Sequence, residues 1–110
     1  MAANDPIDVT RLREALAAGR FEWRRHALER MAERRISQAA ALHVLQWGEC
    51  IEDYPEDRPY ASGLFLGWFQ GKPLHLLAAL DQQHDWAYVI TVYEPDLEHF
   101  EADYRTRRSP

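Results

Sequence analysis

The periodicity of apolar residues changes at Gly48, and this change limits the possible folds more than any other feature of the sequence. Before Gly48, apolar residues recur at the three- and four-residue spacing of helices; after it, apolar and polar residues alternate. We expect a first helix with Asp5 as N-cap, Pro6 at the first position and a stop at Gly19. Further helices are expected over residues 26–34 and, capped by Ser37, up to Trp47. Strands are expected over residues 50–54, 64–69, 73–80 and 86–93.

This order of elements predicts an α+β fold. The N-terminal helices are expected to pack on one face of a four-stranded antiparallel sheet. Phe21-Glu22-Trp23 is an extended stretch or a linker between the first two helices. Pro95 ends the last strand, and residues 96–104 are expected to form a short C-terminal helix. With 110 residues, no internal repeat and no low-complexity segment, residues 1–110 fit a single domain.

The composition excludes several classes of protein. Hydrophobic residues make up 46% and charged residues 28%, which is typical of a globular chain rather than a disordered one. No apolar run approaches the roughly 20 residues of a membrane span, and the N-terminus lacks the apolar stretch of a secretory signal. The single cysteine, Cys50, cannot form an internal disulfide or complete a zinc knuckle. We therefore expect a cytoplasmic protein without membrane contact.

The formal net charge of −5 is unevenly distributed. Residues 11–35 hold eight arginines against four glutamates, whereas residues 49–103 hold twelve acidic residues against Arg58 and Lys72. The overall sign excludes a protein that coats nucleic acid without sequence preference. It leaves room for a small basic site that engages a few phosphates, for which arginine is well suited.

The most informative motif is a row of three basic side chains on the second helix. His26, Arg30 and Arg34 follow each other at intervals of four, so each lies only about 40° further around the helix. An imidazole can move a proton near neutral pH, and guanidinium groups can hold a phosphate. The alternative is a solvated face on which arginines pair with Glu29 and Glu33 and His26 caps its own helix.

The predicted strands offer further polar candidates. Alternation places His75 on the face opposite Leu74 and Leu76, either as a hydrogen-bonded core residue or as a second acid/base group that projects toward the helices. Thr91 and Tyr93 share a face near the end of the last strand, where ligand-facing groups are easily placed. Arg58 either pairs with local acidic residues or reaches a ligand. For Thr91 and Tyr93, structural packing is the alternative.

No metal site or cofactor is expected. The five histidines include no pair at the i, i+4 spacing that is typical of a helical metal site. There is also no glycine-rich phosphate loop and no nucleophile elbow.

Several phrases of the sequence resemble the bacterial domain-of-unknown-function family 4258. The resemblance covers roughly residues 21–95. It rests on His26-Ala27-x-x-Arg30-Met31-x-x-Arg34-x-Ile36-Ser37, Gly48-Glu49-x-Ile51-x-x-Tyr54, Gly71-Lys72-Pro73-Leu74-His75 and Val89-Ile90-Thr91-Val92-Tyr93-x-Pro95. Members of that family resemble toxin ribonucleases of the RelE/barnase-like group, often encoded beside a zinc-finger-type antitoxin.

The resemblance implies a metal-independent endoribonuclease of the mRNA interferase type, with RNA as its substrate. It implies that His26 or His75 acts as acid or base, that Arg30 and Arg34 bind the scissile phosphate, and that Thr91 and Tyr93 line the site. On this view Tyr93 is a catalytic candidate, and Arg58 joins the substrate-binding residues. The rival hypothesis is a non-catalytic protein-interaction module with an acidic sheet face.

Overall fold

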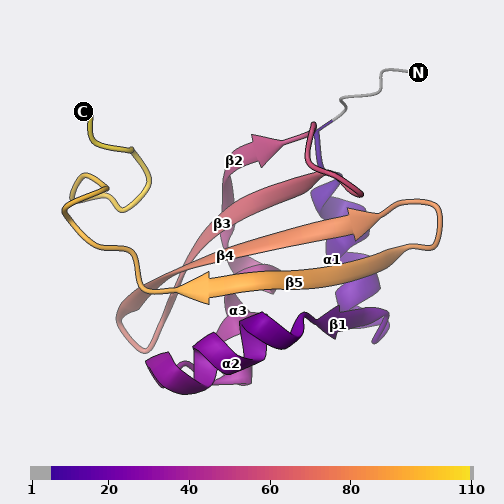
Figure 1. Cartoon of the computed structure of the whole chain (residues 1–110), viewed down its shortest axis with the longest axis horizontal. Coiled ribbons are helices and arrows are strands. Elements are labelled where there is room, and N and C mark those ends of the chain that lie inside the picture. The colour runs from indigo at the N-terminus through magenta and orange to yellow at the C-terminus, as the bar shows by residue number, and fades with distance from the viewer. Residues whose placement is uncertain (1–5, 110) are drawn as a thin grey trace.

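A computed structural model describes residues 6–109 and places three helices and five strands among them (Figure 1). The chain order is α1 (Val9–Ala17), β1 (Phe21–Trp23), α2 (Arg25–Arg34), α3 (Gln38–Trp47), β2 (Glu49–Tyr54), β3 (Ser62–Phe69), β4 (Lys72–Asp81) and β5 (Trp86–Tyr93). The predicted α+β class and the change from helices to strands at Gly48 are confirmed. In the described part of the chain, none of the helices is long and apolar enough to cross a membrane.

The sheet is five-stranded and mixed, in the order β1-β5-β4-β3-β2. The prediction of a four-stranded antiparallel sheet was therefore wrong. The missing strand is β1, which pairs in parallel with β5 and sets Phe21 opposite Ala87. A three-residue strand carries almost no periodicity of its own. Its partner strand lies more than sixty residues away in the sequence, so no hairpin turn between the two strands predicts the pairing either.

The helix ends follow local capping chemistry. The Asp8 side chain accepts a hydrogen bond from the N–H of Arg11 (3.1 Å) and caps α1, while the predicted cap Asp5 lies outside the described residues. Gly19, with φ of 77°, ends the turn after α1, as expected from glycine's tolerance of positive φ. The Ser37 hydroxyl accepts from the N–H of Ala40 (3.0 Å), which confirms the predicted cap of α3.

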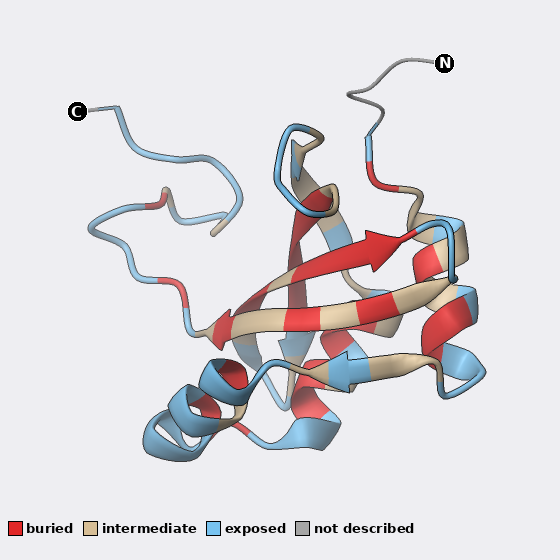
Figure 2. Ribbon diagram, turned by 45° about the vertical axis from the view of Figure 1, so that its right-hand side comes forward, coloured by how far each residue is buried: buried red, intermediate tan, exposed pale blue. Residues whose placement is uncertain are grey.

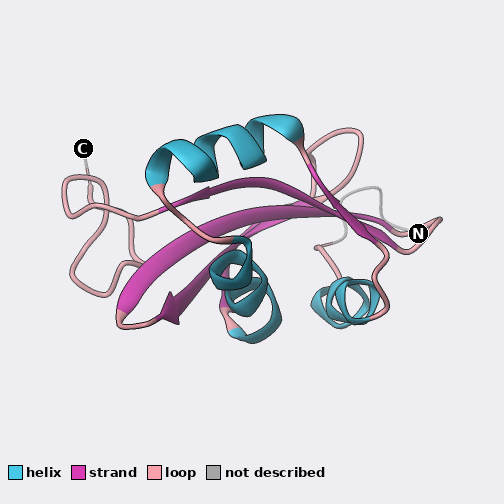
Figure 3. Cartoon of the chain, turned by 90° about the horizontal axis from the view of Figure 1, so that it is seen from below, coloured by secondary structure: helices cyan, strands magenta, loops and turns pink. Residues whose placement is uncertain are grey.

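The main core lies between the sheet and the helices. α1 and α3 lie behind the sheet, and α2 runs beside β5 at its edge (Figures 1 and 3). Ala27 and Met31 of α2 are buried in this core. Leu74 and Leu76 of β4 point into the same core, so His75 between them points to the opposite face, which we call the outer face.

The predicted C-terminal helix does not form, and this expectation was also wrong. Residues 94–109, here called the C-terminal segment, make turns and one isolated bridge between Phe100 and Arg107. A single helix-type hydrogen bond, from the N–H of Phe100 to the carbonyl of Asp96 (3.2 Å), is not propagated. Figure 2 shows most of the C-terminal segment as exposed, and Phe100 is buried within it. Phe100 is the one buried residue of 96–104, so this stretch lacks the continuous apolar stripe that a packed helix would need.

Candidate functional site

Two rows of side chains cross the outer face of the sheet. Strand register aligns the first row as Glu49, Leu66, His75 and Tyr93, and the second as Glu52, Leu64, Leu77 and Thr91. The acidic ends of both rows belong to β2, and the hydroxyl ends belong to β5. Three residues proposed from the sequence, His75, Thr91 and Tyr93, are therefore brought together.

His75 lies at the centre of this face and is completely buried. Its Nε2 lies 2.6 Å from the carbonyl oxygen of Tyr104, and its Nδ1 lies 3.0 Å from the hydroxyl of Tyr93. A carbonyl can only accept, so Nε2 carries the proton and the neutral ring accepts at Nδ1 from Tyr93. Burial lowers the pKa of His75 below its ordinary value, although the hydrogen bond to Tyr104 opposes this. A neutral imidazole with a fixed tautomer results.

The C-terminal segment covers the imidazole. Phe100 meets the His75 ring edge-on, with centroids 4.6 Å apart, and the Arg107 guanidinium lies 4.9 Å from the centroid of the Phe100 ring. Arg107 also donates from Nε to Glu52 Oε2 (2.7 Å) and from Nη2 to Oε1 (3.1 Å). Burial raises the pKa of Glu52, but hydrogen bonds from Arg107 and Tyr54 outweigh it and hold the pKa below its ordinary value. Glu52 is thus an ionised partner that ties the segment to β2.

An open hollow of about 360 Å³ lies beside this covered region. We call it the outer-face hollow; it is lined by Tyr54, Asp57, Leu64, Leu77, Thr91, Tyr93 and Arg107. Tyr93 is half-buried, and burial raises its pKa, which the positive charges of Arg107 and Arg34 partly offset. The Tyr93 phenol therefore keeps its proton at neutral pH. Tyr93 therefore both contacts the buried His75 and lines a space that solvent can enter.

The basic row on α2 does not reach the hollow as a unit. The His26 side chain is 81% exposed and lies 3.3 Å from Glu29, and Arg30 pairs with Glu33 (3.0 Å). The drift of about 40° per step brings only Arg34 round to the sheet, where Nη1 donates to the carbonyl of Val92 (2.7 Å). His26 faces solvent and His75 is buried under the C-terminal segment, so the two imidazoles do not share an accessible site.

Arg58 also lies away from the hollow, although it comes from a neighbouring loop. Its exposed side chain donates to the backbone oxygens of Glu56 (2.9 Å) and Asp57 (3.1 Å). Asp57 itself lines the hollow and accepts a hydrogen bond from Ser62. Arg58 therefore stiffens the loop that supplies Asp57.

Sequence reasoning missed four residues of this site: Glu52, Tyr54, Phe100 and Arg107. Alternation along β2 offered a signal for Glu52 and Tyr54, because every second residue of a strand shares a face. No pattern marks Phe100 or Arg107, since the C-terminal segment is irregular and only the folded chain brings it over β4.

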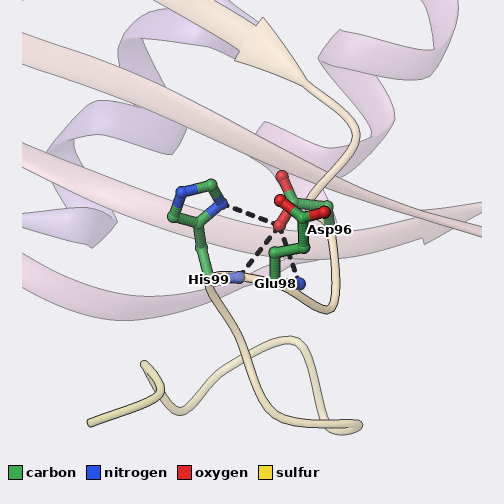
Figure 4. A group of neighbouring side chains, drawn as sticks. All are labelled: Asp96, Glu98 and His99. Atoms are coloured by element: carbon green, nitrogen blue, oxygen red, sulfur yellow. Dashed lines mark hydrogen bonds and ion pairs between the residues drawn. The ribbon is translucent and has the colours of Figure 1, made fainter. Parts of the chain in front are cut away.

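One group of potential metal ligands lies in the C-terminal segment. The ligand atoms of Asp96, Glu98 and His99 lie within 4.8 Å of one another, and all three residues are exposed (Figure 4). Asp96 Oδ1 already accepts hydrogen bonds from the backbone N–H groups of Glu98 (3.0 Å) and His99 (2.9 Å). It also lies 2.8 Å from Nδ1 of His99, which donates to it when that nitrogen carries a proton. These hydrogen bonds account for the group as a local turn.

Comparison with known proteins identifies a family and nothing finer. A family model described as "Domain of unknown function (DUF4258)" matches residues 23–94, which include α2, α3 and strands β2 to β5. No curated protein and no solved structure matches the chain.

Proposed function

The chain belongs to the DUF4258 family, and we propose that it is a metal-independent endoribonuclease of the RelE/barnase-like toxin kind. The observation that carries this proposal is the Tyr93–His75 pair at the wall of an open hollow. His75 offers a free-base nitrogen, and Tyr93 connects that nitrogen to the solvent-accessible side. Thr91 and Arg107 add hydrogen-bond donors in the same hollow, and Arg34 adds a charge that reaches Tyr93.

The reaction proposed for this pair is cyclisation of an RNA phosphodiester. The ribose 2′-oxygen attacks phosphorus as its proton passes to the Tyr93 oxygen, and the Tyr93 proton passes to His75 Nδ1. The bond between phosphorus and the 5′-oxygen breaks, and the leaving oxygen takes a proton from water. The hydroxide so formed takes the proton back from His75 by way of Tyr93, which returns the site to its neutral state. The products are a 2′,3′-cyclic phosphate and a 5′-hydroxyl. Arg34 and Arg107 stabilise the extra negative charge on the phosphoryl oxygens in the transition state.

This arrangement changes the roles suggested by the resemblance. His75 acts through Tyr93 instead of touching RNA, and Arg34 takes the phosphate-binding role without Arg30. His26 and Arg30 lie outside the hollow, on the exposed side of α2.

The test is cleavage of labelled RNA by the purified full chain in excess EDTA, on free RNA and on translating ribosomes, with mapping of the product ends. Tyr93→Phe keeps the ring but removes the relay, and we expect cleavage to fall at least about 100-fold, as for loss of a general base. Arg34→Gln is expected to weaken cleavage as well. Arg25→Gln, an exposed arginine on the same helix, is the matched control and should cleave normally.

Two results would overturn the arrangement or the function. If His26→Ala loses cleavage while Tyr93→Phe keeps it, the reaction takes place on α2. If the native chain leaves no cyclic phosphate under either condition, the ribonuclease proposal fails. The second candidate, a non-catalytic protein-interaction module, then gains weight from the ion pair that holds Arg30.

A neutralising partner belongs to the same proposal. A ribonuclease of a toxin–antitoxin pair halts growth unless a second protein binds it, and the resemblance implies an antitoxin of the zinc-finger type. Expression of the chain alone should therefore arrest a bacterial host, and the Tyr93→Phe variant should not.

A further inference from the structure

A second hollow, of about 460 Å³, opens where the end of α3 meets the start of β2 and the end of β3, and the proposed ribonuclease site does not use it. The β2 ladder begins with Glu49 opposite Leu66, so β2 does not cover the last residues of β3. The end of α3 and the C-terminal segment border this uncovered edge. We call it the tryptophan hollow, because Trp47 and Trp68 line it.

Both tryptophans are far more exposed than a tryptophan usually is. Trp47 is 74% exposed and Trp68 is 50% exposed, and they belong to the three most exposed large hydrophobic residues of the described chain. Two exposed indoles at one hollow form the kind of patch that marks an interaction site. Trp68 is braced by the Tyr104 ring, which meets it edge-on at 5.8 Å.

The floor between the two indoles is rigid. A Cβ on Gly48 would lie 2.6 Å from the carbonyl oxygen of Leu66 and closer still to that of Val44. A Cβ on Gly67 would lie 3.0 Å from Val44 Cγ2. The end of α3 therefore rests directly on the β3 backbone, which fixes Trp47 relative to Trp68. The backbone positions that carry the two indoles are thus set by the fold itself, which lowers the ordering cost of binding.

The charged side chains at the rim are Glu49, Asp103 and Arg105. Arg105 forms an ion pair with Glu49, so these two charges offset each other and the carboxylate of Asp103 supplies the net charge of the rim. The oxygens of Asp103 accept from the backbone N–H groups of Arg105 and Thr106 (both 2.9 Å) and from the Thr106 hydroxyl (2.8 Å), groups that carry no charge. Hydrogen bonds from these N–H groups hold the pKa of Asp103 below its ordinary value, so the carboxylate is ionised at neutral pH.

We propose that the tryptophan hollow binds an arginine or lysine side chain on a basic segment of a partner protein. Indole faces attract cations, and the Asp103 carboxylate supplies the opposite charge beside them. The same carboxylate repels a phosphate, which argues against RNA as the occupant.

The experiment follows the four tryptophan indole N–H signals by NMR in the full chain, with Trp47 and Trp68 assigned through W47F and W68F. The probe is a short capped peptide of alternating arginine and glycine, beside a matched peptide with glutamine in place of arginine. We expect the arginine peptide to shift the Trp47 and Trp68 signals saturably and to leave Trp23 and Trp86 in place. W47A should weaken binding about two- to fivefold, since an exposed cation–π contact is a modest one.

Asp103→Asn keeps a carbonyl oxygen for the local turn while it removes the charge, and it should weaken binding by a similar factor. Asp96→Asn, on the same segment but outside the hollow, is the control and should bind normally. Equal shifts with the glutamine peptide, or none with either peptide, would overturn the proposal. So would an oligouridine that shifts these two indoles and binds more tightly to Asp103→Asn, which would make the hollow a base-binding site.

Discussion

Replacement of Phe100 by alanine tests whether the C-terminal segment is part of the folded structure. Phe100 is only 3% exposed, and it packs between the His75 ring and the Arg107 guanidinium. A buried phenylalanine changed to alanine typically costs about 3–5 kcal/mol. One side of this site is a solvent-exposed arginine, and the segment can detach without unfolding the sheet. We therefore expect a loss near the lower limit, about 3 kcal/mol, at the most.

The assay is urea unfolding followed by two probes. Far-UV circular dichroism reports the helices and sheet, whereas tryptophan fluorescence, to which Trp68 contributes, also reports the segment, because Tyr104 packs on Trp68. In Phe100→Ala, the fluorescence change should come at lower urea than the circular dichroism change. Leu97→Ala is the control on the same segment: Leu97 is 49% exposed, and its loss should cost less than about 0.5 kcal/mol. A Phe100→Ala variant as stable as Leu97→Ala by both probes would refute the docked segment.

Three further predictions follow from the burial and hydrogen bonding of single residues. Burial lowers the pKa of His75 below the 6.5 of the unfolded chain, so at acid pH the unfolded state binds the proton more readily. The free energy of unfolding, measured in urea, should therefore decrease as the pH drops from 6.5 to the folded pKa. His75→Gln should lose part of this acid dependence. Gly48→Ala should destabilise the fold by about 3 kcal/mol or more in thermal unfolding, because the added Cβ would overlap two carbonyl oxygens. Gly71→Ala should cost only about 1 kcal/mol, because there is open space around Gly71 and the penalty comes from its φ of 80° alone. Burial and the charge of Asp53 raise the pKa of the Cys50 thiol to about 11. Alkylation of Cys50 by iodoacetamide at pH 8 should therefore be much slower than that of a small-molecule thiol, and it should accelerate toward pH 11. Equal rates at pH 8 would contradict this.

Sequence patterns predicted those features of the fold that depend on interactions between residues close together in the chain. Ser37 as a cap, Gly19 as a stop and the face assignment of His75 all depend on interactions or directions within a few residues. The same reasoning could not find β1, because its three residues form a strand only through their parallel pairing with β5. It also expected a C-terminal helix over residues 96–104, where Phe100 is the one buried residue and the segment folds back across the sheet.

The residues of the candidate site likewise divide into those that a local rule could place and those that only tertiary packing places. Thr91 and Tyr93 alternate along one strand, and this local rule places both at the outer-face hollow. The row His26, Arg30 and Arg34 also obeys a local rule, but its slow rotation around α2 decides which member meets the sheet. Only Arg34 does so, through the carbonyl of Val92. The position of a helix relative to a sheet edge is a tertiary property that the spacing alone does not contain.

The burial of His75 has a functional consequence that depends on the C-terminal segment. With the segment in place, Tyr104 holds the proton on Nε2 and leaves Nδ1 as the acceptor for Tyr93. Without it, water would reach Nε2, the tautomer would no longer be fixed, and the pKa of His75 would rise toward its ordinary value as burial is lost. If the Tyr93–His75 pair is the base of an RNA-cutting site, loosening the segment by Phe100→Ala should move the acid limb of the cleavage rate to higher pH. A purely structural segment would reduce the amount of folded protein and leave the pH of that limb unchanged.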